Sequence, residues 1–299
     1  MVTAYLAAEG FEDQLRVELG RRIVAEHGRL MICDGPASPT AWAANVWHAA
    51  QEIEIASIGD AANRLRAIQR NWALYAPEHF RRARLIAEKL PHVSARPLVF
   101  PAPAPAAPLG SWTLLAPDRM LAAAECSSAF PNGEIEFVED REGPPNRAYL
   151  KLWEALTRLR RYPQAGEICL DLGASPGGWS FVLAGLGAKV IAIDKSPLDA
   201  KVAAMDGVQW RQDSAFALEP AEFAGVDWLF CDVICYPARL LKMVQRWLER
   251  GRVRNFVCTL KFQGETDHDT ARAFAAIEGA QLFHLHHNKH ELTWALLRQ

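Results

Sequence analysis

Residues 167–197, EICLDLGASPGGWSFVLAGLGAKVIAIDKSP, decide the predicted fold. An apolar run, residues 168–170, ends at Asp171 and is followed by a glycine-rich turn, after which residues 179–186 form a predicted helix. A second apolar strand then ends at Asp194. This order of strand, turn, helix and strand with a terminal acid predicts half of a Rossmann-like unit, in which a ligand lies over the carboxyl ends of parallel strands.

The turn itself points to the class of ligand. It is built on Gly173, Ser175, Pro176, Gly177 and Gly178, which is not the GxGxxG pattern of pyrophosphate-binding turns. Glycine allows close approach of the backbone to a ligand, and Asp194 is placed to accept two ribose hydroxyls. A nucleoside without a diphosphate, such as S-adenosylmethionine, therefore fits better than NAD. The alternative is a tight strand-to-helix turn that binds nothing.

Composition bounds the class of protein. A chain of 299 residues has room for a catalytic domain and a smaller companion, and half of its residues are hydrophobic. No apolar run approaches the roughly 20 residues of a membrane helix, and the N-terminus lacks the basic start of a signal peptide, so we expect a soluble protein without a membrane partner. Six cysteines in so long a chain do not make a disulfide framework, which predicts a reducing, cytoplasmic compartment.

Charge is segregated along the chain although the net charge is only −2. Residues 64–96 hold eight lysines and arginines against two glutamates, residues 141–161 six against two, and residues 239–254 six against one. Basic segments of this kind are a footprint for a polyanion such as RNA, although a single one is more often a solvated helix face.

The N-terminal half has a mixed pattern. It predicts strands at residues 2–7 and 29–33, a strand followed by a turn within residues 46–60, and helices at residues 11–25, 61–74 and 79–90. Five prolines in residues 96–110 predict an extended connector, and two short strands follow at residues 111–115 and 120–126. We assign residues 1–140 to an N-terminal α+β domain and residues 141–299 to a second domain.

The C-terminal half has a regular α/β pattern. An amphipathic helix is predicted at residues 150–159, and further strands at residues 208–211, 226–231, 255–260, 281–286 and 292–297. The last two strands are joined by so few residues that they must be antiparallel, because a parallel crossover needs about a dozen residues or more. A mostly parallel sheet with one antiparallel strand at the C-terminus is the plan of Rossmann-like methyltransferases.

Polar residues mark the ends of these elements. They are Lys151 on the leading helix, Asp232 and Lys261 after two strands, and Glu291 before the last strand. Because strand ends of an open α/β sheet face the ligand crevice, Asp232 and Lys261 should lie beside the ligand of the glycine-rich turn. Asp171, Asp194 and Asp213 add further charge to the same crevice.

These motifs carry a family resemblance. DLGASPGGW at residues 171–179, with Lys151 in YLKLWEA, Asp232 in FCDV, Lys261 in TLKF and Glu291 in HELTW, resembles the Lys-Asp-Lys-Glu tetrad of the FtsJ/RrmJ-like ribose 2′-O-methyltransferases. The similarity is greatest to the RlmM type, which methylates a cytidine ribose in 23S ribosomal RNA and carries an N-terminal THUMP domain. It covers residues 145–299, with YLAAEGFEDQL and CSSAFPNGEIEF in the first 140 residues, and implies that the N-terminal domain is a shortened, THUMP-like RNA-binding domain.

The resemblance also implies roles for individual residues. Lys261 would be the general base, Asp232 would hold its ammonium near the cofactor, and Lys151 and Glu291 would position the base and the ribose. Residues 175–178 would contact the methionine part of S-adenosylmethionine, within a cofactor segment that runs from Gly173 to Trp179. Asp194 would bind the cofactor ribose and Asp213 the adenine amino group. A lysine acts as a base only if its pKa falls well below about 10.4, which a second lysine and partial burial favour.

Two alternatives to RNA ribose methylation remain open. One is a methyltransferase that acts on a non-RNA acceptor, and the other is a non-catalytic RNA-binding or ribosome-maturation factor that keeps the fold. A metal site is not expected, because His284 and His286 would lie on one face of a strand and His287 on the other. The sequence leaves the oligomeric state open.

Overall fold

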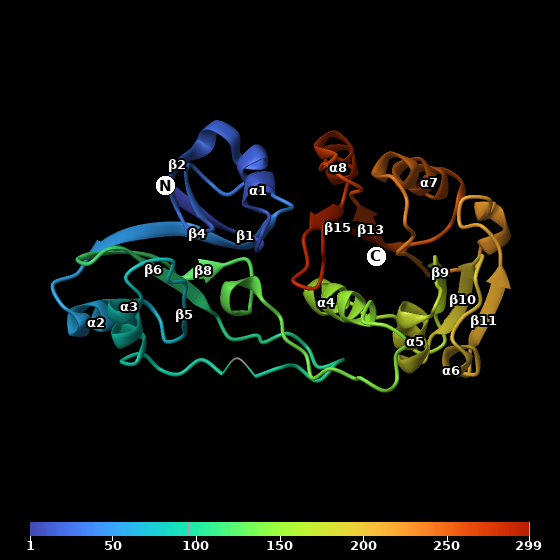
Figure 1. The fold of residues 1–299 in the computed structure, drawn as a ribbon, viewed down its shortest axis with the longest axis horizontal. Helices are drawn as coiled ribbons and strands as arrows, with labels where there is room; N and C mark the ends of the chain where they lie inside the picture. The colour runs from blue at the N-terminus through green and yellow to red at the C-terminus, as the bar shows by residue number, and fades with distance from the viewer. Residues whose placement is uncertain (95, 299) are drawn as a thin grey trace. The chain divides into compact units, whose positions relative to one another are not determined.

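The computed structural model describes residues 1–94 and 96–298 and divides the chain into two compact units. The N-terminal unit holds residues 1–99 and 104–137, and the C-terminal unit holds residues 100–103 and 138–299. Figure 1 colours the first from blue to green and the second from green to red. Residues 100–103 of the proline-rich segment belong to the C-terminal unit, where Phe100 stacks on Trp153 with ring centroids 4.9 Å apart.

One sheet organises the N-terminal unit, with strand order β2-β3-β1-β4-β7-β6-β5 and β8 paired to β4. Its pairs are antiparallel except β5 with β6, which are parallel. The strands are β1 (Val2–Ala7), β2 (Ile23–His27), β3 (Leu30–Asp34), β4 (Ala43–Glu54), β5 (Trp72–Leu74), β6 (Gly110–Ala116), β7 (Arg119–Ala123) and β8 (Glu125–Cys126). The helices are α1 (Glu12–Leu19), α2 (Ile58–Ile68) and α3 (Phe80–Ala87), with short 3-10 turns η1 (Gly20–Arg22) and η2 (Pro131–Gly133).

Two hydrophobic clusters hold this unit together. One packs Leu65 of α2 and Ile86 of α3 against Trp112 of β6, all fully or almost fully buried. The other gathers residues of β1, β3 and β4 around Trp47, with Leu121 of β7. Burial of large apolar side chains from both helices and strands is the main favourable contribution to the stability of such a layer.

Several boundaries in this unit differ from the prediction. The predicted helix at residues 11–25 ends at Leu19, because Gly20 takes a positive φ of 54° and the chain then enters β2. The helix at residues 61–74 ends at Ile68, and residues 72–74 form β5, where Trp72 Nε1 donates to the carbonyl of Leu65. The predicted strand and turn within residues 46–60 are instead the long strand β4 and the start of α2.

The C-terminal unit is the predicted α/β layer structure. Its sheet has the order β11-β10-β9-β12-β13-β15-β14, and every pair is parallel except the two that β15 makes. The strands are β9 (Ile168–Leu172), β10 (Lys189–Asp194), β11 (Val208–Gln212), β12 (Trp228–Cys231), β13 (Asn255–Lys261), β14 (Ala280–Phe283) and β15 (Glu291–Leu297). The single antiparallel strand at the C-terminus is confirmed.

Helices cover both faces of this sheet, with α4 and α5 on one side and α7 and α8 on the other (Figure 1). They are α4 (Tyr149–Leu159), α5 (Gly178–Gly185), α6 (Ala200–Ala203), α7 (Pro237–Arg250) and α8 (His268–Ala275), with the 3-10 turn η3 (Pro220–Phe223). Strand order reverses between β9 and β12, since β10 and β11 extend the sheet one way and β13 the other. Ligands of open α/β sheets bind at the carboxyl ends of the strands beside such a reversal.

Across the described part of the chain, none of the helices combines the length and the apolar character needed to cross a bilayer. All six cysteines are free thiols, and five of them are buried.

Candidate active site

The glycine-rich turn after β9 needs its glycines for backbone reasons. Gly173 has a φ of +77°, and a Cβ placed there would lie 2.6 Å from Cγ2 of Val233. Gly177 has a φ of +117°, and its Cβ would lie 2.9 Å from Cγ1 of Val202. Because Val233 follows Asp232 directly, the close approach at Gly173 brings the end of β12 against the turn.

Asp194 at the end of β10 is tied to the same turn. Its Oδ2 accepts a hydrogen bond from the backbone N–H of Ser175 at 3.1 Å, and its Oδ1 accepts one from Ser196 at 2.9 Å. The hydroxyl of Ser175 donates to the carbonyl of Pro197 at 2.9 Å. The turn and the end of β10 therefore form one hydrogen-bonded edge, with a partly exposed carboxylate on it.

Asp213 follows the next strand, β11, and lies beside Asp194, whose carbonyl accepts from its N–H at 3.3 Å. The backbone N–H of Ser214 and the guanidinium of Arg211 both donate to the Asp213 carboxylate, each at 2.7 Å. These contacts, with the Ser214 backbone first, hold the pKa of Asp213 below its usual range. An adenine ligand would compete with Arg211 for this carboxylate.

Trp179 has a structural position. Its side chain is only 4% exposed, its Nε1 donates to the carbonyl of Ala148 at 3.0 Å, and its ring meets Phe230 edge-on. The indole thus joins the start of α5 to the start of α4. Contact with a ligand at this position would come from the backbone.

The four predicted catalytic residues converge. Lys151 Nζ lies 3.0 Å from Asp232 Oδ1 and 3.2 Å from Glu291 Oε1, and Lys261 Nζ lies 3.1 Å from Asp232 Oδ1. Lys261 also donates to the backbone carbonyl of Asp232 at 2.6 Å, and it stands opposite Glu291 in the register of β13 and β15. Their side chains are between 10 and 19% exposed, so the cluster is a mostly buried set of two cations and two anions.

The two lysines of this tetrad have different environments. Burial by itself lowers the pKa of Lys151, but the carboxylates of Asp232 and Glu291 outweigh it, so this pKa is raised above its ordinary value. Lys151 therefore remains an ammonium at neutral pH. Among the described residues, Lys261 has one carboxylate partner, Asp232. Both ammonium nitrogens contact the same oxygen, Asp232 Oδ1, which places two like charges close together.

Asp171 is buried on β9 beneath this edge. Its Oδ2 accepts from the hydroxyl of Ser180 at 2.7 Å, whereas its Oδ1 makes no hydrogen bond with any described residue. Burial raises the pKa of Asp171 to about 7, and the nearby charges of Asp232 and Asp194 act in the same direction. A carboxyl group that is half protonated near neutral pH thus underlies the site.

Sequence reasoning missed a buried carboxylate, Glu154, which is on α4 one turn after Lys151. Its oxygens accept from the backbone N–H groups of His286 and His287 at 2.8 and 3.0 Å, and from His287 Nδ1 at 2.7 Å. Arg158 Nε also lies 3.0 Å from it. Glu154 therefore binds the loop that leads to Glu291. The only signal in the sequence is an acid among the apolar positions of an amphipathic helix.

The histidines of this loop do not lie on a strand as predicted, because β14 ends at Phe283. His284 is buried with Nε2 3.0 Å from the carbonyl of Lys289, and burial lowers its pKa to about 4. Within the described residues, no group of three or more His, Cys, Asp or Glu side chains is arranged to hold a metal ion.

Comparison with known proteins agrees with the resemblance in sequence. Residues 144–286 match the family model of FtsJ-like methyltransferases. Three relatives are each named "Ribosomal RNA large subunit methyltransferase M". That of Halorhodospira halophila is 36% identical over 50% of this chain and 46% of its own length. That of Marinomonas sp. is 29% identical over 58% and 54%, and that of Azotobacter vinelandii 31% over 60% and 54%.

This chain thus spans about half the length of these relatives. The matched segment contains Lys151, Asp232, Lys261 and the glycine-rich turn, and it ends shortly before Glu291. Residues 144–286 are thus similar to the FtsJ-like methyltransferases over almost half of this chain.

Proposed function

We propose that this protein transfers a methyl group from S-adenosylmethionine to a ribose 2′-hydroxyl of ribosomal RNA. The observation that carries the proposal is the convergence of Lys151, Asp232, Lys261 and Glu291 at the carboxyl ends of the strands that bear the glycine-rich turn. The names of the relatives support ribosomal RNA as the substrate. The resemblance to the RlmM type supports a cytidine of 23S ribosomal RNA.

The residues beside the turn fit this cofactor. Asp194 offers a partly exposed carboxylate for ribose hydroxyls, and Asp213 offers a second one directly after the next strand, β11. The turn from Gly173 to Gly178 carries no long side chain, and Gly173, Ser175 and Pro176 in it are partly exposed, which suits the methionine part. Asp171 adds a buried Oδ1 that makes no hydrogen bond with any described residue. Asp232, a member of the tetrad, adds a further carboxylate beside the turn.

Lys261 is the better candidate for the general base. Two carboxylates hold the proton on Lys151, whereas Lys261 has one carboxylate partner and a like charge next to it. Repulsion between neighbouring cations favours loss of a proton from one of them. Lys261, with fewer carboxylate contacts than Lys151, is therefore the amine to which we assign the role of the base.

The chemistry follows from these positions. S-adenosylmethionine, when bound, supplies an electrophilic methyl group on a sulfonium. Lys261, as the base, would take the proton of the ribose hydroxyl while the oxygen would form its bond to the methyl carbon and the methyl–sulfur bond would break, with S-adenosylhomocysteine as the leaving group. Asp232 would stabilise the ammonium that results. Lys151 would position Asp232 through their ion pair, and Glu291 would position Lys261 from the neighbouring strand. General-base catalysis of this kind contributes roughly 10²- to 10⁴-fold to the rate.

We further propose that residues 1–140 form a THUMP-like domain that holds the RNA. The basic segment at residues 64–96 lies in this unit, and Arg70, Arg81 and Arg96 are exposed. Phosphate contacts from such residues supply sequence-independent affinity. The free thiols agree with a cytoplasmic location.

A lysine substitution tests the reaction. Lys261→Ala should bind S-adenosylmethionine with unchanged affinity by calorimetry and lose about 100-fold or more of methyl transfer to 23S ribosomal RNA. Lys189→Ala, at an exposed position at the start of β10 and outside the three basic segments, is the matched control and should keep full activity. Full activity of Lys261→Ala would overturn the assignment of the base. Absence of cofactor binding by the unaltered protein would favour a non-catalytic RNA-binding factor.

The acceptor is tested separately. Ribose methylation mapped across total RNA from cells with and without the gene should differ at a position in 23S ribosomal RNA. An unchanged map, with cofactor binding intact, would point to a methyltransferase with a non-RNA acceptor.

A further inference from the structure

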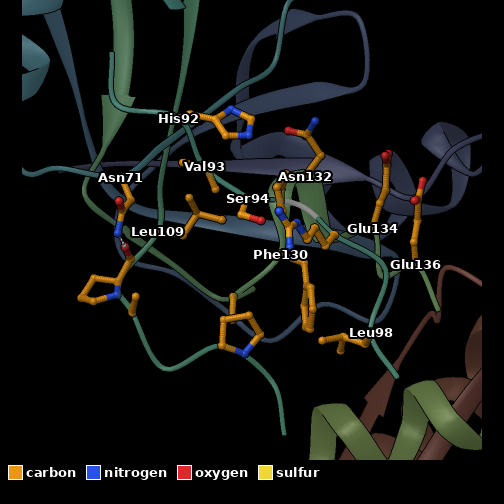
Figure 2. Close-up of a pocket in the computed structure, with 16 residues that line it drawn as sticks. Asn71, His92, Val93, Ser94, Leu98, Leu109, Phe130, Asn132, Glu134 and Glu136 are labelled. Carbon is orange, nitrogen blue, oxygen red and sulfur yellow. Dashed lines mark hydrogen bonds between the residues drawn. The ribbon is translucent and has the colours of Figure 1, made fainter. Parts of the chain in front are cut away.

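The N-terminal unit contains a cavity of about 350 Å³. Its walls come from Asn71 before β5, from residues 92–94, 96 and 98, from residues 105 and 107–109 of the proline-rich segment, and from residues 129–132, 134 and 136 around η2. Figure 2 shows Phe130, Ser94 and Leu109 around the hollow, with His92 and Asn132 toward one end. None of these residues belongs to the methyltransferase site.

The walls are fixed to the rest of the unit. Asn71 Nδ2 donates to the carbonyl of Pro108 at 3.2 Å, and the N–H of Leu98 donates to the carbonyl of Glu136 at 2.8 Å. Gly133 lies so close to β4 that a Cβ there would be 2.0 Å from the carbonyl oxygen of Ala44. The cavity is thus bounded by segments that hydrogen bonds and close backbone contact hold in place.

The lining combines three kinds of group. Phe130 supplies an aromatic ring, half-buried in the wall. Asn132 has a buried Oδ1 that makes no hydrogen bond to any described residue, and an unpaired buried acceptor is costly unless a ligand satisfies it. Arg96 supplies an exposed cation. Two carboxylates also line the cavity: Glu134 is paired with Arg29 at 2.9 Å, and Glu136 is exposed, opposite in charge to Arg96.

We propose that this cavity receives one unpaired nucleobase of an RNA strand. An aromatic face stacks on a base, an amide hydrogen-bonds the base edge, and an arginine contacts the adjoining phosphate, which is how proteins recognise single-stranded RNA. The volume lies at the lower end of the roughly 300–1,000 Å³ of small-ligand pockets, which suits a base and not a duplex. Asn71, His92 and Arg96 of the cavity wall belong to the basic segment of residues 64–96, so cations of that segment lie at the cavity itself.

This proposal rests on the proposed RNA substrate and adds the place where the N-terminal unit contacts a base. The test of the base-binding cavity is a binding assay with the full chain. Fluorescence anisotropy measures the affinity for a fluorescein-labelled single-stranded RNA of about eight nucleotides. Phe130→Leu should weaken binding roughly tenfold, because stacking on an aromatic ring is lost. Phe80→Leu, an exposed phenylalanine outside the cavity, is the matched control and should change the affinity by less than about twofold.

A second pair of variants distinguishes a phosphate contact at the cavity from the non-specific attraction of the RNA to surface cations. Arg96→Gln should weaken binding and reduce its salt dependence, whereas Arg84→Gln, exposed on α3 and outside the cavity, should do so less. Thermal unfolding of each variant establishes that it is folded.

Equal affinities of Phe130→Leu and Phe80→Leu would overturn the proposal, as would failure of the unaltered protein to bind the RNA. Tight binding of 5′-CMP alone, with no gain from the RNA strand, would also overturn it and indicate a free nucleotide as ligand. Different results would overturn the methyltransferase assignment: failure of the protein to bind S-adenosylmethionine, or full activity of the Lys261→Ala variant.

Discussion

Replacing Asp171 by asparagine should change the pH dependence of stability. Asp171 is 1% exposed, and its carboxylate has one hydroxyl donor, Ser180. Burial raises its pKa from 3.8 to about 7 in the folded protein. Between these two values the folded state binds a proton that the unfolded chain does not, so the stability contributed by this group falls as pH rises from about 4 to 7.

The size of the effect follows from the shift. A difference of one pKa unit corresponds to about 1.36 kcal/mol, so a shift from 3.8 to about 7 corresponds to roughly 4 kcal/mol at pH 8. Asparagine resembles the protonated acid in shape and has no charge to bury. The free energy of unfolding of Asp171→Asn should therefore equal that of the unaltered protein below about pH 4, exceed it increasingly as pH rises, and exceed it by as much as roughly 4 kcal/mol at pH 8.

Hydrogen exchange in increasing urea, read on peptides that contain β9, measures this stability in the C-terminal unit without interference from the other unit. The two proteins are compared at pH 5, 6.5 and 8, each rate being corrected for its intrinsic dependence on pH. Asp206→Asn, at an exposed turn position, is the matched control and should show no pH-dependent difference. A difference between Asp171→Asn and the unaltered protein that stays constant from pH 5 to 8 would refute the reasoning.

Three further substitutions test the site. Glu154→Gln should destabilise the C-terminal unit by about 3 kcal/mol, because it leaves Arg158 with a buried neutral partner, and urea unfolding should show no such loss for the exposed Glu249→Gln. Asp194→Asn should weaken binding of S-adenosylmethionine by roughly tenfold or more in calorimetry while melting close to the unaltered protein. Gly173→Ala should cost about 1–3 kcal/mol in the same unfolding experiment, because its φ is +77° and Val233 fills the space; an alanine protein of full stability would contradict this.

The C-terminal unit was predictable because each of its elements has a local signal. Alternation of apolar strands and amphipathic helices gave the parallel sheet, and a connection of a few residues gave the antiparallel β15. Asp232 and Lys261 could be placed in one crevice because parallel strands end at the same edge. Lys151 could not be placed in this way, since nothing local states where a helix lies against a sheet, and only the family resemblance joined it to the others.

The N-terminal unit was less predictable because its strands depend on distant partners. The three residues of β5 form a strand only through pairing with β6, almost 40 residues later, and local propensity therefore extended the preceding helix over them. The strand β4 pairs with β1 at one end and with β7 at the other, so its length reflects two separate neighbours.

The tetrad depends on a carboxylate that takes no part in it. Lys151 and Glu154 are one turn apart on α4, and Glu154 binds the backbone of His286 and His287, a few residues before Glu291. The separation of 3.2 Å between Lys151 and Glu291 is thus set by two routes, directly by their ion pair and indirectly through Glu154. Because a displacement of about 1 Å at a catalytic group can cost 100-fold in rate, a buried carboxylate that anchors the loop to the helix is as necessary to the proposed reaction as the charges it positions.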